Sequence, residues 1–194
     1  MQLVLMTSYS PGTGKTSTVV ESIVQLVRRD AGVRILVCAP SDAAADLLAV
    51  RLAAAGLDSD KLYRLNASSH YEEDISEDLQ IFSLFPGHER LLAFRVVLST
   101  CSSAAMLQTL NVPVGHFSHI VIDEASQAEE PLVMIPIAAF SNGYTNIILA
   151  GDPNQLGPHI KSPTAAKAGL WTSYLQRLML IREVYGLDTQ VGET

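Results

Sequence analysis

Six short apolar runs, each followed by a segment with helical spacing, constrain the fold of this chain more than any other feature. The runs are 3–6, 34–39, 61–65, 95–99, 119–123 and 146–151. Their residues are nearly all apolar and do not alternate with polar ones, which is typical of strands that helices cover on both faces. Strands that alternate with helices along a chain build a parallel sheet. The pattern therefore predicts an α/β fold with a mostly parallel sheet between two helical layers.

Four of the segments between these runs predict helices. They are Lys15–Arg29, Asp42–Ala55, Ser102–Leu110 and Leu132–Phe140. The second is introduced by Ser41 and Asp42, residue types that favour helix N-termini. Residues 66–94 show no clear pattern, and five of the eight residues 71–78 are acidic, which is typical of a solvated surface segment.

Composition limits the class of protein. With 194 residues, 48% of them hydrophobic and 17% charged, the chain is expected to form one globular domain. Cys38 and Cys101 lie in or beside apolar runs, as buried free thiols do, which favours a reducing, intracellular compartment. No apolar run approaches the ~20 residues that span a bilayer, so we expect no membrane association. The net charge of −7 argues against a broad basic surface, although backbone N–H groups and hydroxyls can also hold nucleic-acid phosphates.

A glycine-rich loop follows the first predicted strand, in the run TSYSPGTGKTSTVVES at residues 7–22. Its candidate nucleotide-binding residues are Gly12, Thr13, Gly14, Lys15 and Thr16. Glycines let backbone N–H groups point at a phosphate, where the N-terminus of the next helix adds its positive dipole. Lys15 would then reach the β- and γ-phosphates and Thr16 the Mg²⁺. The alternative is an ordinary turn with a solvated lysine, and Tyr9 stands where this loop type has its first glycine.

Two further motifs follow buried strands. HIVIDEAS at 119–126 ends a strand with Asp123, suited to hold Mg²⁺ through water, and Glu124, suited to deprotonate an attacking water. Alone, this acidic pair could equally cap the next helix. NIILAGDPNQLGP at 146–158 places Asp152 and Gln155 after another strand, and on its own it is ordinary turn chemistry. The order and spacing of the three motifs together predict a nucleotide site.

These motifs resemble those of the first RecA-like motor domain of superfamily 1 helicases of the Upf-like branch. The matching segments are PGTGKTSTVVE for motif I, CAPSDAAADLL for Ia, LSTCSSA for Ib, DEASQ for II and GDPNQLGP for III. YRLNASS, HFSHIVIDEASQAEEPLVMIPI and LAGDPNQLGPHIKSP most resemble Armitage-type, silencing-defective or Moloney-leukaemia-virus-ten-like RNA helicases. The resemblance implies a RecA-like P-loop NTPase domain over residues 1–180. Residues 181–194 are then expected to be a connector toward a second RecA-like domain.

The resemblance also implies a function and the residues for it. It implies an ATP- and Mg²⁺-dependent motor on single-stranded RNA, usually moving 5′ to 3′, that is cytoplasmic and works with RNA-silencing proteins. Lys15 and Thr16 would bind phosphate and Mg²⁺, Asp123 and Glu124 would serve metal and water, Gln155 would sense the γ-phosphate, and Gln127 would position nucleotide or water. The implied RNA track consists of Pro40, Ser41, Ser99 and Thr100. Helix caps and turns are the alternative roles for those four residues.

Three departures from the family pattern leave other functions open. Tyr9 and Ser10 replace the usual glycine and proline of the loop. The family's adenine-recognition segment would lie upstream of residue 1, and motifs IV to VI, with their phosphate-contacting arginines, would lie in the second domain. We therefore expect a fragment with little activity alone. The alternatives are a DNA helicase motor domain of the same superfamily and a non-catalytic, nucleotide-dependent RNA-binding module; small-molecule kinases share only the loop.

Overall fold

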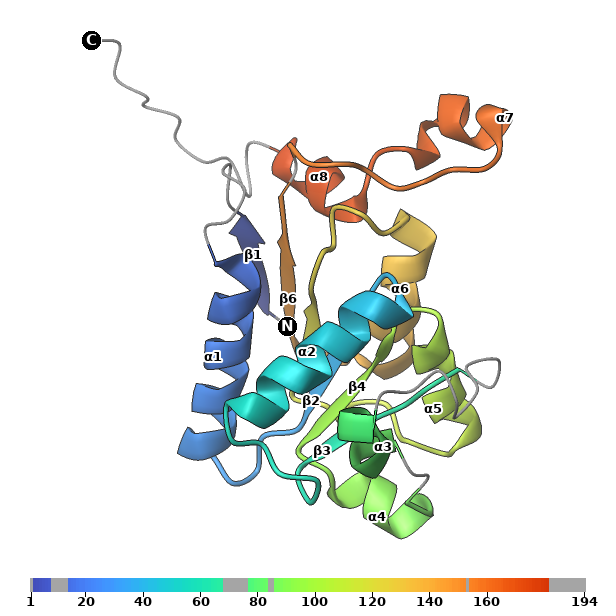
Figure 1. The fold of residues 1–194 in the computed structure, drawn as a ribbon. Helices are drawn as coiled ribbons and strands as arrows, with labels where there is room; N and C mark the ends of the chain where they lie inside the picture. The colour runs from blue at the N-terminus through green and yellow to red at the C-terminus, as the bar shows by residue number, and fades with distance from the viewer. Residues whose placement is uncertain (1, 8–13, 68–76, 84–85, 153, 182–194) are drawn as a thin grey trace, which may run out of the picture.

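Six parallel strands form one sheet, in the order β1-β6-β5-β2-β4-β3 (Figure 1). The computed structural model describes residues 2–7, 14–67, 77–83, 86–152 and 154–181. The strands are β1 (Gln2–Thr7), β2 (Ile35–Ala39), β3 (Leu62–Arg64), β4 (Val96–Thr100), β5 (His119–Ile122) and β6 (Asn146–Gly151). All five neighbouring pairs run parallel, so the predicted parallel sheet is confirmed. The connector expected at 181–194 lies, apart from its first residue, outside the described residues.

Strand β2 shows why the apolar runs lack alternation. All five of its residues are buried. Leu36 and Cys38 belong to the hydrophobic core on one side of the sheet, whereas Ile35 and Val37 belong to the core on the other side. Successive side chains of a strand point to opposite faces, so a strand covered on both faces needs an apolar residue at every position.

Helices cover both faces of the sheet. They are α1 (Lys15–Arg29), α2 (Asp42–Ala54), α3 (Glu77–Ser83), α4 (His88–Ala93), η2 (Ser103–Ala105), α5 (Met106–Thr109), α6 (Glu130–Phe140), α7 (Pro163–Ala165), η3 (Ala166–Leu170) and α8 (Tyr174–Met179). Ile23 of α1 and Leu48 of α2 lie in one core, and Phe140 of α6 and Leu175 of α8 lie in the other. Among the described helices, none is both long and apolar enough to cross a lipid bilayer.

The predicted helices differ from the observed ones mainly at their ends. The segment predicted as one helix over Ser102–Leu110 is a 3₁₀ turn followed by the short α5. The helix predicted from Leu132 begins at Glu130, because Pro131 fits the first turn of a helix, where no N–H is needed. The short helices α3, α4, α7 and α8 and the segment η3 were not predicted.

A buried arginine ties β3, a strand at one edge of the sheet, to the start of α2. The side chain of Arg64 is fully buried. Its guanidinium donates hydrogen bonds to the carboxylates of Asp42 and Asp46, each at 2.8 Å, and to the carbonyl of Leu65. A buried charge is tolerated only when it is paired in this way. Because both carboxylates belong to the first two turns of α2, the contact holds the N-terminus of that helix against β3.

Candidate nucleotide-binding site

Helix α1 begins directly behind the predicted phosphate loop. Its N-cap is Gly14, whose φ of 82° is left-handed and therefore favours glycine. No side chain among the described residues caps this end of the 15-residue helix. Such an N-terminus attracts anions. Gly12, Thr13 and Tyr9 lie outside the described residues.

Lys15 lies against the end of β6. Its ammonium Nζ is 3.5 Å from Oδ2 of Asp152. The Lys15 side chain is 14% exposed and the Asp152 side chain 1% exposed, so this ion pair is largely shielded from water. The predicted lysine of motif I and the aspartate of motif III therefore meet in the folded chain.

Asp123 and Thr16, the two residues predicted to hold Mg²⁺, lie close together. Asp123 follows β5, is only 3% exposed, and has the Thr16 hydroxyl near enough to lower its pKa. Burial raises the pKa of Asp123 above its ordinary value; the negative charge of Glu124 acts in the same direction, and the bonds from the Glu124 N–H and Thr16 oppose it. A carboxylate beside a hydroxyl suits Mg²⁺, which takes one or two protein ligands together with phosphate oxygens and water. Accordingly, the described residues contain no cluster of three His, Cys, Asp or Glu side chains that could hold a metal alone.

Glu124 has an unusual backbone. Its φ is 52°, in the left-handed region that residues other than glycine rarely adopt, at a cost of about 1–3 kcal/mol. The amide Nε2 of Gln127 donates to its Oε2 at 2.9 Å, and the N–H of Ala125 donates to the carbonyl of Ala150 in β6. The fold therefore brings the predicted Glu124 and Gln127 together. The acidic pair does not cap the next helix, because α6 begins at Glu130 with Glu129 as its N-cap.

Asp152 is a site residue to which the sequence analysis gave no role. Its carboxylate accepts from the Asn154 N–H at 3.0 Å and from Nε2 of Gln155 at 2.8 Å, besides the ion pair with Lys15. Burial alone would raise the pKa of Asp152, but the hydrogen bonds from Asn154 and Gln155 and the charge of Lys15 lower it below its ordinary value. An aspartate in a sequence such as GDPNQ is common in turns. Only its spacing from the phosphate loop could have indicated that Asp152 contacts Lys15 and Gln155.

The four residues predicted to line an RNA track lie at the carboxyl ends of β2 and β4, but only part of the set is accessible. Ser41 is exposed and Pro40 is half-buried. Ser41 caps α2, accepting from the N–H of Ala44. Ser99 is fully buried beside the thiol of Cys38, and Thr100 is 3% exposed, with its hydroxyl bonded within the following turn. In this structure Ser41 and Thr100 therefore have the cap and turn roles, and the Ser99 and Thr100 side chains do not reach the surface.

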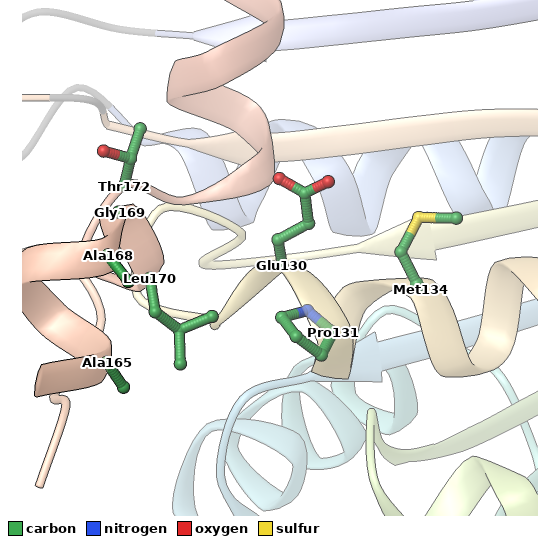
Figure 2. A pocket seen from close by; sticks show the side chains of 8 residues that line it. All are labelled: Glu130, Pro131, Met134, Ala165, Ala168, Gly169, Leu170 and Thr172. Carbon is green, nitrogen blue, oxygen red and sulfur yellow. The ribbon is translucent and has the colours of Figure 1, made fainter. Parts of the chain in front are cut away.

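A separate pocket of about 510 Å³ lies between the N-terminus of α6 and the α7–η3 segment (Figure 2). Apolar side chains such as Met134 and Leu170 line much of it. The carboxylate of Glu130, which lines the pocket, accepts two hydrogen bonds from one edge of the Arg177 guanidinium. Nε and Nη2 of Arg177 each donate to it at 2.7 Å. None of the residues predicted to bind nucleotide or RNA lines this pocket, so it is distinct from the site around Lys15 and Asp152.

Matches were found to a family model, to known protein sequences and to solved structures. A family model described as an AAA domain matches residues 4–92 and 74–163. The chain is 44% identical to mov-10-B.1 of Danio rerio over 95% of its own length, and 42% identical to the RNA helicase Mov10l1 of Homo sapiens over 87%. It spans only 19% and 14% of those relatives. A structure of S. cerevisiae Dbp5 bound to RNA and ADP BeF3 aligns with 77% of this chain and 36% of that chain, with a TM-score of 0.54 at 18% identity, a similarity of fold alone.

Proposed function

The chain belongs to the AAA domain family, and from this premise we propose that it is the ATP-binding motor domain of an ATP-dependent RNA helicase. The observation that carries the proposal is the meeting of three motifs at one edge of the sheet. Lys15 contacts Asp152, and Thr16 contacts Asp123, although these residues come from distant parts of the chain. Ligands of parallel α/β sheets bind outside the carboxyl ends of the strands, which is where all four residues lie.

ATP with Mg²⁺ fits the residues that meet here. The first turn of α1, which no described side chain caps, would bind phosphate oxygens through its N–H groups, and Lys15 would exchange the Asp152 carboxylate for phosphate. Thr16 and Asp123 would hold the cation, whose charge offsets the negative charge that develops during phosphoryl transfer. Gly12 and Thr13 are proposed to bind phosphate from their positions in the motif.

Glu124 is the best candidate for the general base. Asp123 is buried beside Thr16, whereas Glu124 is half-buried and accepts a hydrogen bond from Gln127. Its left-handed backbone turns it away from the regular course of β5. Glu124 would take a proton from the attacking water, with Gln127 fixing its orientation and Gln155 contacting the terminal phosphate.

Single-stranded RNA is the proposed polymer substrate. RNA is favoured over DNA because a relative that matches most of this chain is named as an RNA helicase. Pro40 and Ser41 are the proposed contacts, since they reach the surface at the carboxyl end of β2. Movement 5′ to 3′, a cytoplasmic setting and RNA-silencing partners follow from the resemblance. A second RecA-like domain would supply the arginines that phosphoryl transfer requires, worth ~10³–10⁵ in rate, so the domain alone should turn over very slowly.

Two substitutions test the assignment. Lys15→Ala should abolish binding of a fluorescent ATP analogue with Mg²⁺, because it removes the cation that meets the phosphates. Glu124→Gln should bind nearly as the wild type does, yet lose at least about 10²-fold in residual RNA-stimulated ATP hydrolysis. Adding single-stranded DNA in place of RNA distinguishes the two polymers. If both variants lost binding equally, the separate roles proposed for Lys15 and Glu124 would be wrong. Nucleotide binding by the wild type with no ATP hydrolysis in the presence of RNA would favour the non-catalytic binding module.

A further inference from the structure

The side chain of Gln155 is exposed, but its amide end is anchored to a buried carboxylate. Nε2 of Gln155 donates to Oδ2 of Asp152 at 2.8 Å, and the Asp152 side chain is 1% exposed. An ionised carboxylate only accepts hydrogen bonds, whereas an amide has a donating nitrogen end and an accepting oxygen end. Asp152 can therefore bind only the nitrogen end of Gln155.

We infer that Asp152 is a positioning residue that holds the Gln155 amide with its nitrogen toward the phosphate site, so that the second N–H of that nitrogen can donate to a terminal phosphate. The inference rests on the proposed function and specifies how this site distinguishes a triphosphate from a diphosphate. With the opposite orientation, Gln155 would present its carbonyl oxygen to an anion, which is repulsive.

The carboxylate is itself fixed, so it can impose an orientation. Oδ1 of Asp152 accepts from the Asn154 N–H, and the Asp152 N–H donates to Oγ of Ser126 at 3.3 Å. The preceding Gly151 is tightly packed, because a Cβ there would lie 2.8 Å from Cδ2 of Leu175 and 2.9 Å from the Ser126 nitrogen. Neither the backbone nor the side chain of Asp152 is therefore free to turn away from Gln155.

Lys15 and Gln155 share the same oxygen of Asp152, but not equally. Nζ of Lys15 is 3.5 Å from Oδ2, whereas Nε2 of Gln155 is 2.8 Å from it. If Lys15 moves to a phosphate, Oδ2 keeps Gln155 as its partner, and the loss of the competing cation strengthens that bond. The largest causes that lower the pKa of Asp152 are the hydrogen bonds from Asn154 and Gln155, which do not depend on Lys15, so the carboxyl stays ionised at neutral pH and remains an acceptor.

The test compares the affinities for a non-hydrolysable ATP analogue and for ADP, both with Mg²⁺. The proteins are wild type, Asp152→Asn, Gln155→Ala and the double variant, with Asp58→Asn, at an exposed aspartate elsewhere, as the matched control. We expect Asp152→Asn to weaken triphosphate binding by about three- to ten-fold, the effect of one hydrogen bond, and to leave ADP binding within about two-fold. The double variant should bind the triphosphate no more weakly than Gln155→Ala alone, because both changes remove the same contact.

Equal loss of both affinities in Asp152→Asn, or additive losses in the double variant, would overturn the inference. A wild-type protein that binds neither nucleotide would refute the proposed function as well, so the two failures are distinguishable. If Asp152→Asn does not fold, the wild type alone remains informative through nuclear magnetic resonance of the Gln155 side-chain amide. One of its two protons should be shifted and protected by the carboxylate, and adding the triphosphate, but not ADP, should shift the other. Equivalent, unprotected amide protons would contradict the inference.

Discussion

The Thr16 hydroxyl lies near enough to the Asp123 carboxylate to lower the pKa of that group, which places the first turn of α1 beside the end of β5. These are the two residues that the sequence assigned to Mg²⁺ from separate motifs. Their contact occurs inside the protein, where Asp123 is 3% exposed. Burial of an ionised carboxylate without a bound cation lowers the free energy of unfolding. Substitution of Asp123 should therefore reveal how much stability the buried charge costs.

Asp123→Asn should stabilise the metal-free protein at neutral pH while abolishing Mg²⁺-dependent nucleotide binding. Burial raises the pKa of Asp123 above 3.8, so the folded state loses stability as pH rises from about 3.8 through the raised pKa, and the loss persists above it. Asparagine removes that cost. Thermal unfolding without Mg²⁺ should show a higher Tm for the variant at pH 7, by about 2–4 °C per kcal/mol, and a smaller difference near pH 4. A lower Tm for the variant at pH 7 would show that the carboxylate stabilises the fold.

Glu124→Gly should also stabilise the protein and inactivate it. Glycine adopts a left-handed φ without the cost that Glu124 incurs at 52°, which is about 1 kcal/mol or more. Denaturant unfolding measures the gain. Asn111→Gly is the matched control, because Asn111 has a φ of 58° but asparagine tolerates this conformation better, so its gain should be smaller. Equal gains at both positions would mean that Glu124 is not specially strained.

Arg64→Ala should destabilise the fold by about 2–4 kcal/mol, since it leaves Asp42 and Asp46 without their buried cation. Those carboxylates are 37% and 27% exposed, so water offsets part of the loss. Arg177→Ala, which breaks the ion pair with Glu130, should cost about 1 kcal/mol or less because Arg177 is 49% exposed. Urea unfolding of the two variants gives the comparison, and similar losses would contradict the special role of burial at Arg64.

Gly151→Ala should cost about 1–3 kcal/mol, because its Cβ would meet the Ser126 backbone nitrogen and Leu175 at less than 3.0 Å. Gly143→Ala provides the control, since a Cβ there meets nothing within 4 Å. Denaturant unfolding of the two variants and the wild type gives the free energies of unfolding to be compared. A neutral effect at Gly151 would mean that Leu175 and the turn at Ser126 can shift freely.

The sheet could be predicted because strands that are buried on both faces have an apolar residue at nearly every position. The run predicted at 34–39 is strand β2 at 35–39, and every residue of that strand is buried. Helix α1 was predictable in full, since its apolar positions repeat with helical spacing. The short α8 was not, because six residues carry too few turns to show a period.

The residues of the candidate site could be predicted from the sequence where they belong to a motif. Lys15 meets Asp152 and Thr16 lies beside Asp123, so the motifs that the sequence placed at one nucleotide site are close together in the fold. Accessibility was harder to predict, because it depends on packing between distant segments. Thr100 belongs to a motif that resembles the RNA-contacting motif Ib of helicases. Its hydroxyl, however, donates a hydrogen bond to the Ser103 hydroxyl inside a turn. A sequence motif fixes residue type and order, whereas the direction of a side chain is decided by the tertiary structure.

The pairing of β1 with β6 has a consequence for how the protein reaches its native state. These strands are neighbours in the sheet, with Gln2 beside Asn146 and Thr7 beside Gly151, but they come from opposite parts of the chain. Joining them closes a very long loop, which is entropically slow. Since Lys15 follows β1 and Asp152 follows β6, the proposed nucleotide site cannot form until this closure is complete. Nucleotide affinity would then appear among the last properties gained on refolding and disappear among the first on unfolding.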